Sequence, residues 1–256
     1  MLRSIIRILP LLCLCPIWLG AQQNGDAPAD SLLRSEEYGI RLGVDLSRPL
    51  ITFLDDAYQG FEVVGDYRLT HHWYLAAEMG NESRDVTEEL GNLNDVNVVS
   101  IYDFTSAGSY LKVGADYNTY QNWYGMNNSI IVGARYAFST FTTDLNSFRY
   151  FDSNRYWSPD GFQPGTDLPR ELSGLNASWL EALIGIKTEL FANIYLGASL
   201  RIGMLISRKE SELMPHIWIP GFNRVNDTSS FGVGFNYSLS YLLPLYRKAR
   251  ARTPEE

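Results

Sequence analysis

Apolar and polar residues alternate at every second position over residues 38–47. Glycine, arginine, aspartate and serine occupy one set of positions, and the other set consists of Tyr38, Ile40, Leu42, Val44 and Leu46. A period of two places successive side chains on opposite faces of a β-strand. The segment therefore predicts a strand with one apolar face, which packs either against a protein core or against membrane lipid.

The same alternation recurs along the chain in residues 61–69, 73–80, 111–118, 130–139, 180–190, 195–207 and 231–241. In all of these segments the apolar face carries no charged residue. The opposite face carries Arg41, Asp45, Glu62, Asp66, Arg68, Glu78, Lys112, Asp116, Arg135, Glu181, Lys187, Glu189 and Arg201. Soluble β-sandwiches alternate in the same way, so the alternation alone leaves both a sandwich and a barrel open.

The connections between the segments decide between these folds, because they alternate in length. Short turns lie at residues 70–72 and 191–193 and near Trp123, whereas the long connections are residues 49–60, 81–110, 140–179 and 208–230. An even number of strands, strand lengths near the roughly 9–11 residues of a tilted membrane strand, and long loops on one side are typical of Gram-negative outer-membrane barrels. The sequence therefore predicts an all-β fold, an eight-stranded antiparallel up-and-down transmembrane β-barrel over residues 38–246. A soluble periplasmic barrel or sandwich is the alternative.

The N-terminal residues predict export. Arg3 and Arg7 precede an apolar run that ends with the small residues Gly20 and Ala21, which is the pattern of a secretory signal peptide over residues 1–21. No later run of apolar residues is long enough for a transmembrane helix. We expect residues 22–37 to form a periplasmic segment, residues 247–256 a periplasmic tail, the long loops to be extracellular, and the protein to lie in the outer membrane.

Composition excludes several kinds of chemistry. Both cysteines, Cys13 and Cys15, lie within the predicted signal peptide, so we expect no disulfide, thiol catalysis or cysteine–metal site in the barrel. The net charge of −8 at pH 7 becomes more negative once Arg3 and Arg7 are removed, which disfavours nucleic-acid binding. No nucleotide-binding glycine motif is present, and we expect no cofactor.

The thirteen charged residues of the polar face are expected to fill the barrel interior. The lumen of an eight-stranded barrel is just wide enough for side chains. Cations and anions are nearly balanced on this face, and buried charges are tolerated when they are paired. We therefore predict an interior polar network that closes the lumen. A narrow solute channel, a proton or ion path, and a buried catalytic site are the alternatives.

Histidines offer the few candidates for catalysis or metal binding. His71 and His72 lie in a predicted short turn, and His216 lies in the loop 208–230. A lone histidine without a second histidine or a cysteine is a weak metal signal, so we expect no metal site. No catalytic motif such as G-x-S-x-G is present, and we expect no enzyme. The alternative is a lipid-modifying enzyme that uses His216 at the outer rim.

Two loop features suggest contacts outside the barrel. Residues 81–104 are acidic, with Glu82, Asp85, Glu88, Glu89, Asp95 and Asp103, and they either bind divalent cations beside lipopolysaccharide or form a solvated face. A candidate contact surface, for a partner or for other loops, consists of Phe148, Tyr150, Phe151, Tyr156, Trp157, Phe162, Trp218 and Phe222. We expect a non-enzymatic barrel that serves envelope structure or binds a partner, with membrane lipid, lipopolysaccharide and another envelope protein as partners.

Several blocks, in order along the chain, resemble a family of small outer-membrane barrels of Bacteroidota. They are YGIRLGVDLSRPL, GFEVVGDYRLT, YLKVGADYN, SFRYF, WIPGFNR and FGVGFNYSLSYLLPLY. The resemblance implies an outer-membrane location, and it brings neither an assigned function nor catalytic residues. More loosely, the chain is similar to OmpA-like barrels and to the small barrel of the type IX secretion system, an analogy of fold alone.

Overall fold

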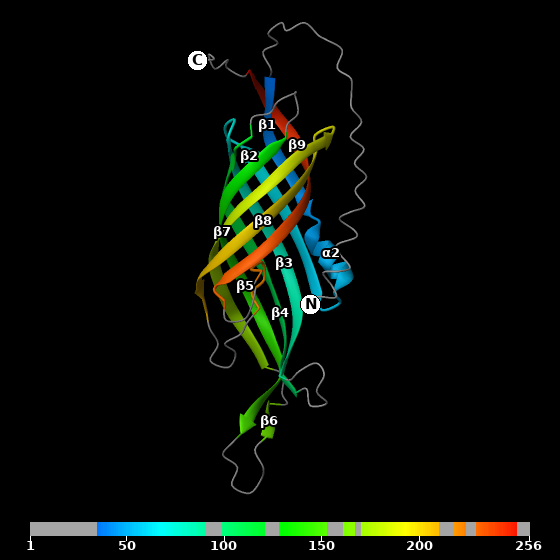
Figure 1. Cartoon of the computed structure of the whole chain (residues 1–256), viewed down its shortest axis with the longest axis vertical. Coiled ribbons are helices and arrows are strands. Elements are labelled where there is room, and N and C mark those ends of the chain that lie inside the picture. The colour runs from blue at the N-terminus through cyan, green and yellow to red at the C-terminus, as the bar shows by residue number, and fades with distance from the viewer. Residues whose placement is uncertain are drawn as a thin grey trace. The chain divides into compact units, whose positions relative to one another are not determined.

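The structure is a computed structural model that describes residues 35–90, 99–120, 128–152, 161–166, 170–209, 218–223 and 229–249. The predicted signal peptide and most of the predicted N-terminal segment and C-terminal tail lie outside these residues. Within them the chain forms β1 (Ser35–Asp45), α2 (Ser47–Leu54), β2 (Tyr58–Arg68), β3 (Trp73–Leu90), β4 (Val99–Asn118), β5 (Ser129–Asp152), β6 (Gly161–Thr166), β7 (Arg170–Phe191), β8 (Ile194–Arg208) and β9 (Phe231–Ala249) (Figure 1).

The strands form a closed antiparallel ring. Their order is β4-β3-β2-β1-β9-β8-β7-β5-β6, and β4 also pairs with β5, so that eight strands close the ring and β6 extends one edge of β5. Strands that follow one another along the ring are neighbours, as in an up-and-down barrel. The predicted eight-stranded antiparallel β-barrel is confirmed.

The apolar parity of the strands faces outward. Leu42 on β1, Val132 on β5 and Ile202 on β8 are 50%, 53% and 58% exposed, whereas charged residues of the opposite parity are buried inside. A soluble barrel or sandwich would have the reverse arrangement. We call these outward residues the apolar belt; they include Leu42, Met79, Leu111, Val132, Ile184, Leu200 and Phe235. None of the described helices is both long and apolar enough to cross a membrane.

The two ends of the barrel differ (Figure 1). At one end, the turn end, tight turns join β2 to β3 and β7 to β8, as predicted for residues 70–72 and 191–193. Ala192 and Asn193 in the second turn have φ values of 47° and 66°, the left-handed conformations that a two-residue hairpin turn requires. At the other end, the loop end, β3, β4 and β5 continue well beyond the apolar belt.

The predicted bounds of two long loops are therefore wrong. Residues 81–90 and 99–110 belong to β3 and β4, and residues 140–152 and 170–179 belong to β5 and β7. Backbone pairing continues there, for example between Arg84 and Ser106. The inner face of these extensions is buried and partly apolar, whereas the outward face becomes polar, so the apolar outward face that marks the barrel strands is lost. The barrel bounds also shift slightly, because β1 and β9 stay paired from Ser35 and Ala249 onward.

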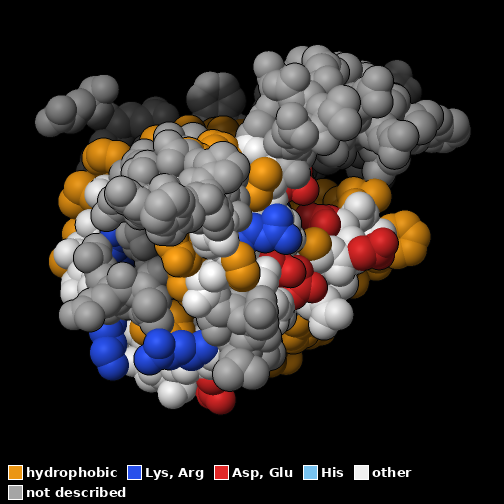
Figure 2. All heavy atoms as spheres, turned by 90° about the horizontal axis from the view of Figure 1, so that it is seen from below, with side chains coloured by type: hydrophobic (Ala, Val, Ile, Leu, Met, Phe, Trp, Pro, Cys, Tyr) orange, Lys and Arg blue, Asp and Glu red, His pale blue; other side chains and the backbone are white. Residues whose placement is uncertain are grey.

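The interior changes character along the barrel axis. Charged side chains fill the turn half and the middle. The loop half contains a buried apolar cluster of Phe104, Tyr110, Ala137, Phe141, Leu145, Leu175, Ala177, Trp179, Ile219 and Phe222. Figure 2 looks onto the loop end, where apolar side chains lie around much of the outline and basic and acidic side chains lie close together within it.

Candidate functional site

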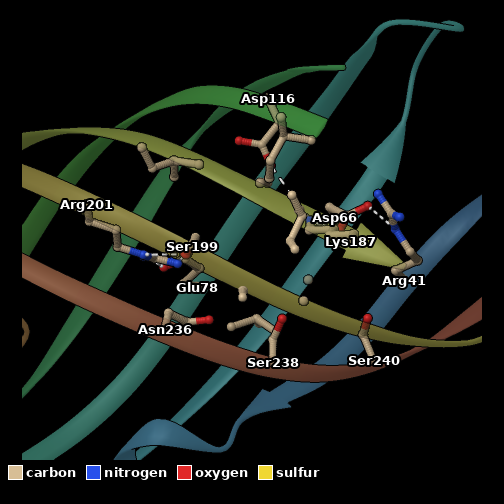
Figure 3. Close-up of a pocket in the computed structure, with 18 of the residues that line it drawn as sticks. Arg41, Asp66, Glu78, Asp116, Lys187, Ser199, Arg201, Asn236, Ser238 and Ser240 are labelled. Atoms are coloured by element: carbon tan, nitrogen blue, oxygen red, sulfur yellow. Dashed lines mark hydrogen bonds and ion pairs between the residues drawn. The ribbon is translucent and has the colours of Figure 1, made fainter. Parts of the chain in front are cut away.

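The candidate site is the ionic network inside the barrel, part of which Figure 3 shows. Its members, buried except for the half-buried Lys187, come from almost every strand of the ring. They are Arg41 on β1, Asp66 on β2, Glu78 on β3, Lys112 and Asp116 on β4, Arg135 on β5, Glu181 and Lys187 on β7, and Arg201 on β8. All belong to the face that the sequence assigned to the interior, because period-two alternation sends their side chains inward.

In the turn half, charges of alternating sign cross the lumen. Arg41 Nε lies 2.7 Å from Asp66 Oδ1, and Lys187 Nζ lies 2.7 Å from Asp66 Oδ2. Lys187 also lies 3.8 Å from Asp116, whose Oδ1 lies 2.7 Å from Arg135 Nη1. The five side chains project from five different strands, so this part of the lumen is bridged from wall to wall.

In the middle of the barrel, two carboxylates each receive several donors. Glu78 accepts from Arg135 Nε at 3.3 Å and from both terminal nitrogens of Arg201. Glu181 Oε1 accepts from Lys112 Nζ at 2.8 Å and from the indole N–H of Trp179 at 2.7 Å. Charge-assisted hydrogen bonds of this kind offset part of the cost of burying ions.

A small cavity remains within the network. Its volume is about 40 Å³, and its lining includes Arg41, Asp66, Glu78, Asp116, Lys187, Arg201, Asn236 and Ser238 (Figure 3). A polar cavity of this size accommodates a few water molecules. It is too small for a sugar or an amino acid, so the interior has the form of a packed plug.

Residues 218–223 fold into the loop end of the barrel and close it. Gly221 has a φ of 81°, which favours glycine, and its N–H donates to Glu82 Oε2 at 2.9 Å. Ser106 Oγ donates to the carbonyl oxygen of Trp218 at 3.1 Å. The ring of Phe222 packs 5.4 Å from that of Trp179. We call residues 218–223 the mouth segment.

The prediction that Trp218 and Phe222 belong to a surface is wrong, because both lie in the mouth segment. Phe222 is buried and Trp218 is half-buried, with its ring edge-on to that of Tyr58 at 6.4 Å. Both side chains therefore pack inside the barrel instead of forming part of an outer contact surface. The apolar interior of the loop half offers them more favourable surroundings than water, which explains the difference.

A cluster around Arg48 was not predicted from the sequence. Arg48 projects from α2 into the barrel, where Nη1 lies 3.0 Å from Glu82 Oε1 and donates to Asn223 Oδ1 at 3.2 Å. Glu62 lies 3.8 Å from the same guanidinium. The hydroxyl of Tyr110 donates to the carboxylates of both Glu62 and Glu82. Glu82 is fully buried, so its assignment to a solvated acidic loop was wrong.

The remaining predicted network residues lie at the margins. Asp45 is buried and accepts from the N–H and the hydroxyl of Ser47, both at 2.7 Å. Arg68 is half-buried at the turn end, where its guanidinium stacks over Tyr38 at 4.6 Å. Glu189 is half-buried beyond the central ion pairs.

The predicted contact surface is only partly described. Tyr150 and Phe151 are exposed on β5, at 50% and 56%, and Phe148 is half-buried against Tyr102, with ring centroids 6.4 Å apart. Phe162 lies on β6, opposite Phe151. The other two residues of this surface, Tyr156 and Trp157, lie outside the described residues. The same holds for Asp95 of the acidic segment and for the candidate His216.

The two described histidines belong to the turn between β2 and β3. His71 Nδ1 lies 3.1 Å from Arg68 Nη2, and His72 Nδ1 lies 2.9 Å from the carbonyl oxygen of Asn118. Within the described ranges, no group of three or more His, Cys, Asp or Glu side chains is placed to hold a metal ion.

Comparisons with known proteins give a family without an assigned activity. Among solved structures, the chain is similar to Ail, the attachment invasion locus protein of Yersinia pestis, at 10% identity and a TM-score of 0.37, over 80% of this chain and 97% of Ail. The comparison with curated proteins gives no match. The sequence model described as "Domain of unknown function (DUF6048)" matches residues 1–248. The chain therefore belongs to the DUF6048 family.

Proposed function

We propose that the protein is a non-enzymatic outer-membrane β-barrel that binds a partner in the cell envelope through the strand extensions at its loop end. In this proposal the signal peptide directs export, the apolar belt contacts lipid, and the ionic network closes the lumen. The observation that carries it is the inverted barrel, with apolar side chains outside and paired charges inside.

The membrane location rests on the apolar belt. Outward side chains such as Met79, Ile184 and Leu200 are among the most exposed of the large apolar residues that are described, and such residues recur on all strands of the ring. Contiguous apolar surface of this extent is unfavourable in water. A closed barrel satisfies its backbone hydrogen bonds within the sheet, which is what the hydrocarbon of a bilayer requires. Lipid is therefore the surrounding that this outer surface fits.

A partner-binding role rests on the strand extensions beyond the belt. Here β3, β4 and β5 continue as a paired sheet, and β6 adds to it along β5. Tyr150 and Phe151 are exposed on this sheet without belonging to the belt. Exposed aromatic side chains on a rigid sheet offer a large contact area to a protein partner, and binding costs little conformational entropy because the sheet is already ordered. The closed lumen makes transport through the barrel a poorer proposal.

Two measurements test this proposal. Membrane fractionation should place the protein with outer-membrane markers, and extraction should require detergent; a protein that stays dissolved without detergent contradicts the proposed location. In a mild detergent, the wild type should migrate as a larger complex on a native gel. The variant Tyr150→Ser with Phe151→Ser should migrate as the free barrel.

The matched control is Asn146→Ser, which changes an exposed residue on the same strand and should leave the complex intact. If the wild type migrates as a monomer in every mild detergent, the partner-binding role is wrong while the membrane location stands. The two parts of the proposal therefore fail separately.

A further inference from the structure

The barrel wall has a break at the loop end, between β2 and β9. Strand β1 lies between them in the turn half, but it ends at Asp45, opposite Ser238 on β9. Strand β9 begins seven residues closer to the loop end, at Phe231. Strand β2 begins at Tyr58, whereas its pairing with β1 begins only at Val63, opposite Val44. These parts of β2 and β9 are not paired with each other. A strand is therefore missing from the wall along this stretch.

Helix α2 occupies the break. The helix lies beside the strands at the level of the barrel wall (Figure 1). Just before it, the Leu46 N–H donates to the carbonyl oxygen of Tyr237 on β9 at 2.6 Å. On the other side, the hydroxyl of Thr52 accepts the N–H of Gly60 on β2 at 3.0 Å. The helix thus bonds to both edges of the break, with far fewer backbone hydrogen bonds than a strand would make.

The polarity of α2 is the reverse of that expected for a helix between protein and water. Its buried residues are Ser47 and Arg48, while Leu50, Phe53 and Leu54 are exposed, Phe53 at 85%. A helix on a water-facing surface buries its apolar side and exposes its charges. The flanking strands present exposed apolar side chains as well, Phe61 on β2 and Phe235 on β9. The outer face of α2 is therefore continuous with the apolar belt.

Arg48 attaches the helix to the interior. Its guanidinium reaches Glu82 on β3, Glu62 on β2 and Asn223 of the mouth segment. It also lies 3.6 Å from Asp45 and donates to the hydroxyl of Tyr58 at 3.4 Å. Inside the barrel, the side-chain amide of Asn236 on β9 donates to Oε1 of Glu62 on β2 at 3.0 Å, and this hydrogen bond links the two edges of the break. Arg48 thus carries most of the side-chain contacts between the helix and the polar interior, and Ser47 adds its hydrogen bonds to Asp45.

We propose that α2 is a lipid-contacting panel of the barrel wall, which Arg48 latches over the break between β2 and β9. The outer face of the panel packs against acyl chains of the membrane, and its inner face separates those chains from the carboxylates of Glu62 and Glu82. The inference rests on the proposed membrane location, because acyl chains are the partner that continuity with the belt requires.

Lipid contact is tested with a fluorophore on single cysteines, after replacement of Cys13 and Cys15 with serine. The sites are Phe53→Cys on the panel, Leu200→Cys in the belt and Asn146→Cys on β5 beyond it, all three exposed. The protein is reconstituted in phosphatidylcholine vesicles with or without brominated acyl chains. We expect quenching at the Phe53 site of about half or more of that at the Leu200 site, and little at the Asn146 site.

The three sites separate the two proposals. Quenching at the Leu200 site without quenching at the Phe53 site overturns the panel and leaves the membrane barrel standing. Absence of quenching at the Leu200 site contradicts the membrane barrel itself. Substitution of Phe53 removes no buried contact, so loss of folding is not expected at the decisive site.

The latch is tested by Arg48→Gln, with Arg84→Gln as the matched control. Arg84 pairs with Asp55 just after the helix at 3.8 Å, but both side chains are well exposed. A spin label at position 53 should become about twofold more mobile in Arg48→Gln and should not change in Arg84→Gln. Unchanged mobility in Arg48→Gln overturns the latch. If Arg48→Gln does not fold, Arg48→Lys serves instead, because one ammonium group cannot reach all the partners of the guanidinium. This variant should give a smaller increase in mobility, and no increase overturns the latch equally.

Discussion

Lys112 and Glu181 meet inside the barrel, with Nζ of Lys112 2.8 Å from Oε1 of Glu181 and both side chains buried. They project from β4 and β7, which are separated in the ring by β5, so the ion pair spans a neighbouring strand. Glu181 also accepts from Trp179 and lies 3.5 Å from Arg201, which in turn binds Glu78. Removal of one charge therefore disturbs the balance of several others.

The first prediction concerns this ion pair. Lys112→Met should lower the free energy of unfolding by about 3 kcal/mol, because it leaves a buried carboxylate without its nearest cation. Adding Glu181→Gln should recover about half of the loss or more, since the neutral amide can still accept from Trp179. Urea unfolding in phospholipid vesicles, followed by tryptophan fluorescence, measures both values.

Lys209→Met is the control for the loss of a lysine. Lys209 is exposed, and its ammonium donates only a hydrogen bond to the carbonyl oxygen of Gly174 among the contacts that are described. Its replacement should change stability by no more than about 0.5 kcal/mol. Equal effects of Lys112→Met and Lys209→Met would contradict the importance of the interior network.

The barrel strands were predictable because lipid and a polar lumen impose opposite demands on the two faces of each strand. Within the belt, every second residue had to be apolar, so strand identity and the inward direction of residues such as Glu78 and Arg135 followed from the sequence. Beyond the belt this contrast disappears, as between Asp85 and Glu89, where polar residues dominate both faces. In the extensions of β3 and β4 backbone pairing continues, but the outward face no longer carries the apolar residues by which the strands were recognised.

The Arg48 cluster was missed for a different reason. Glu82 was assigned to an acidic loop, although it continues the inward parity of Glu78 and Gly80, and Tyr110 likewise continues that of Lys112. Extending the parity past the end of the apolar face would have found both. Arg48 offers no such signal, because its inward direction depends on how α2 fills a break that only the three-dimensional ring reveals.

The second prediction tests the lipid-facing side of the wall. Leu200→Arg on β8 should cost about 2–4 kcal/mol in vesicles, because it places a cation at the middle of the apolar belt. The control, Thr87→Arg, adds the same side chain to an exposed outward position of β3 beyond the belt. It should change stability by less than about 0.5 kcal/mol. Equal costs at the two positions would contradict a bilayer around the belt.

The third prediction concerns catalysis. If the protein is not a lipid-modifying enzyme, His216→Ala should leave the lipid A of the membrane unchanged. Mass spectra of lipid A from the wild type, the variant and a deletion strain should then be identical. A lipid A species that is present in the wild type but missing from both the deletion strain and His216→Ala would instead assign a lipid-modifying activity that depends on this histidine.

The last prediction separates the two closures of the lumen, the mouth segment and the ionic network. Gly221 has a φ of 81°, and an added Cβ would lie 2.5 Å from the ring of Tyr110, which Glu62 and Glu82 hold in place. Gly221→Ala should therefore cost about 3 kcal/mol, from backbone strain and from steric overlap together.

Gly174→Ala is the control, because Gly174 has a similar φ of 67° but only Lys209 Nζ, at 4.0 Å, near the added Cβ. It should cost about 1 kcal/mol, from backbone strain alone. In planar bilayers neither variant should show discrete conductance steps, because the ion pairs of Glu78, Asp66 and Glu181 still bridge the lumen when the mouth segment shifts. Steps in Gly221→Ala would mean that the mouth segment is the principal closure, and steps in the wild type would mean that the lumen is open.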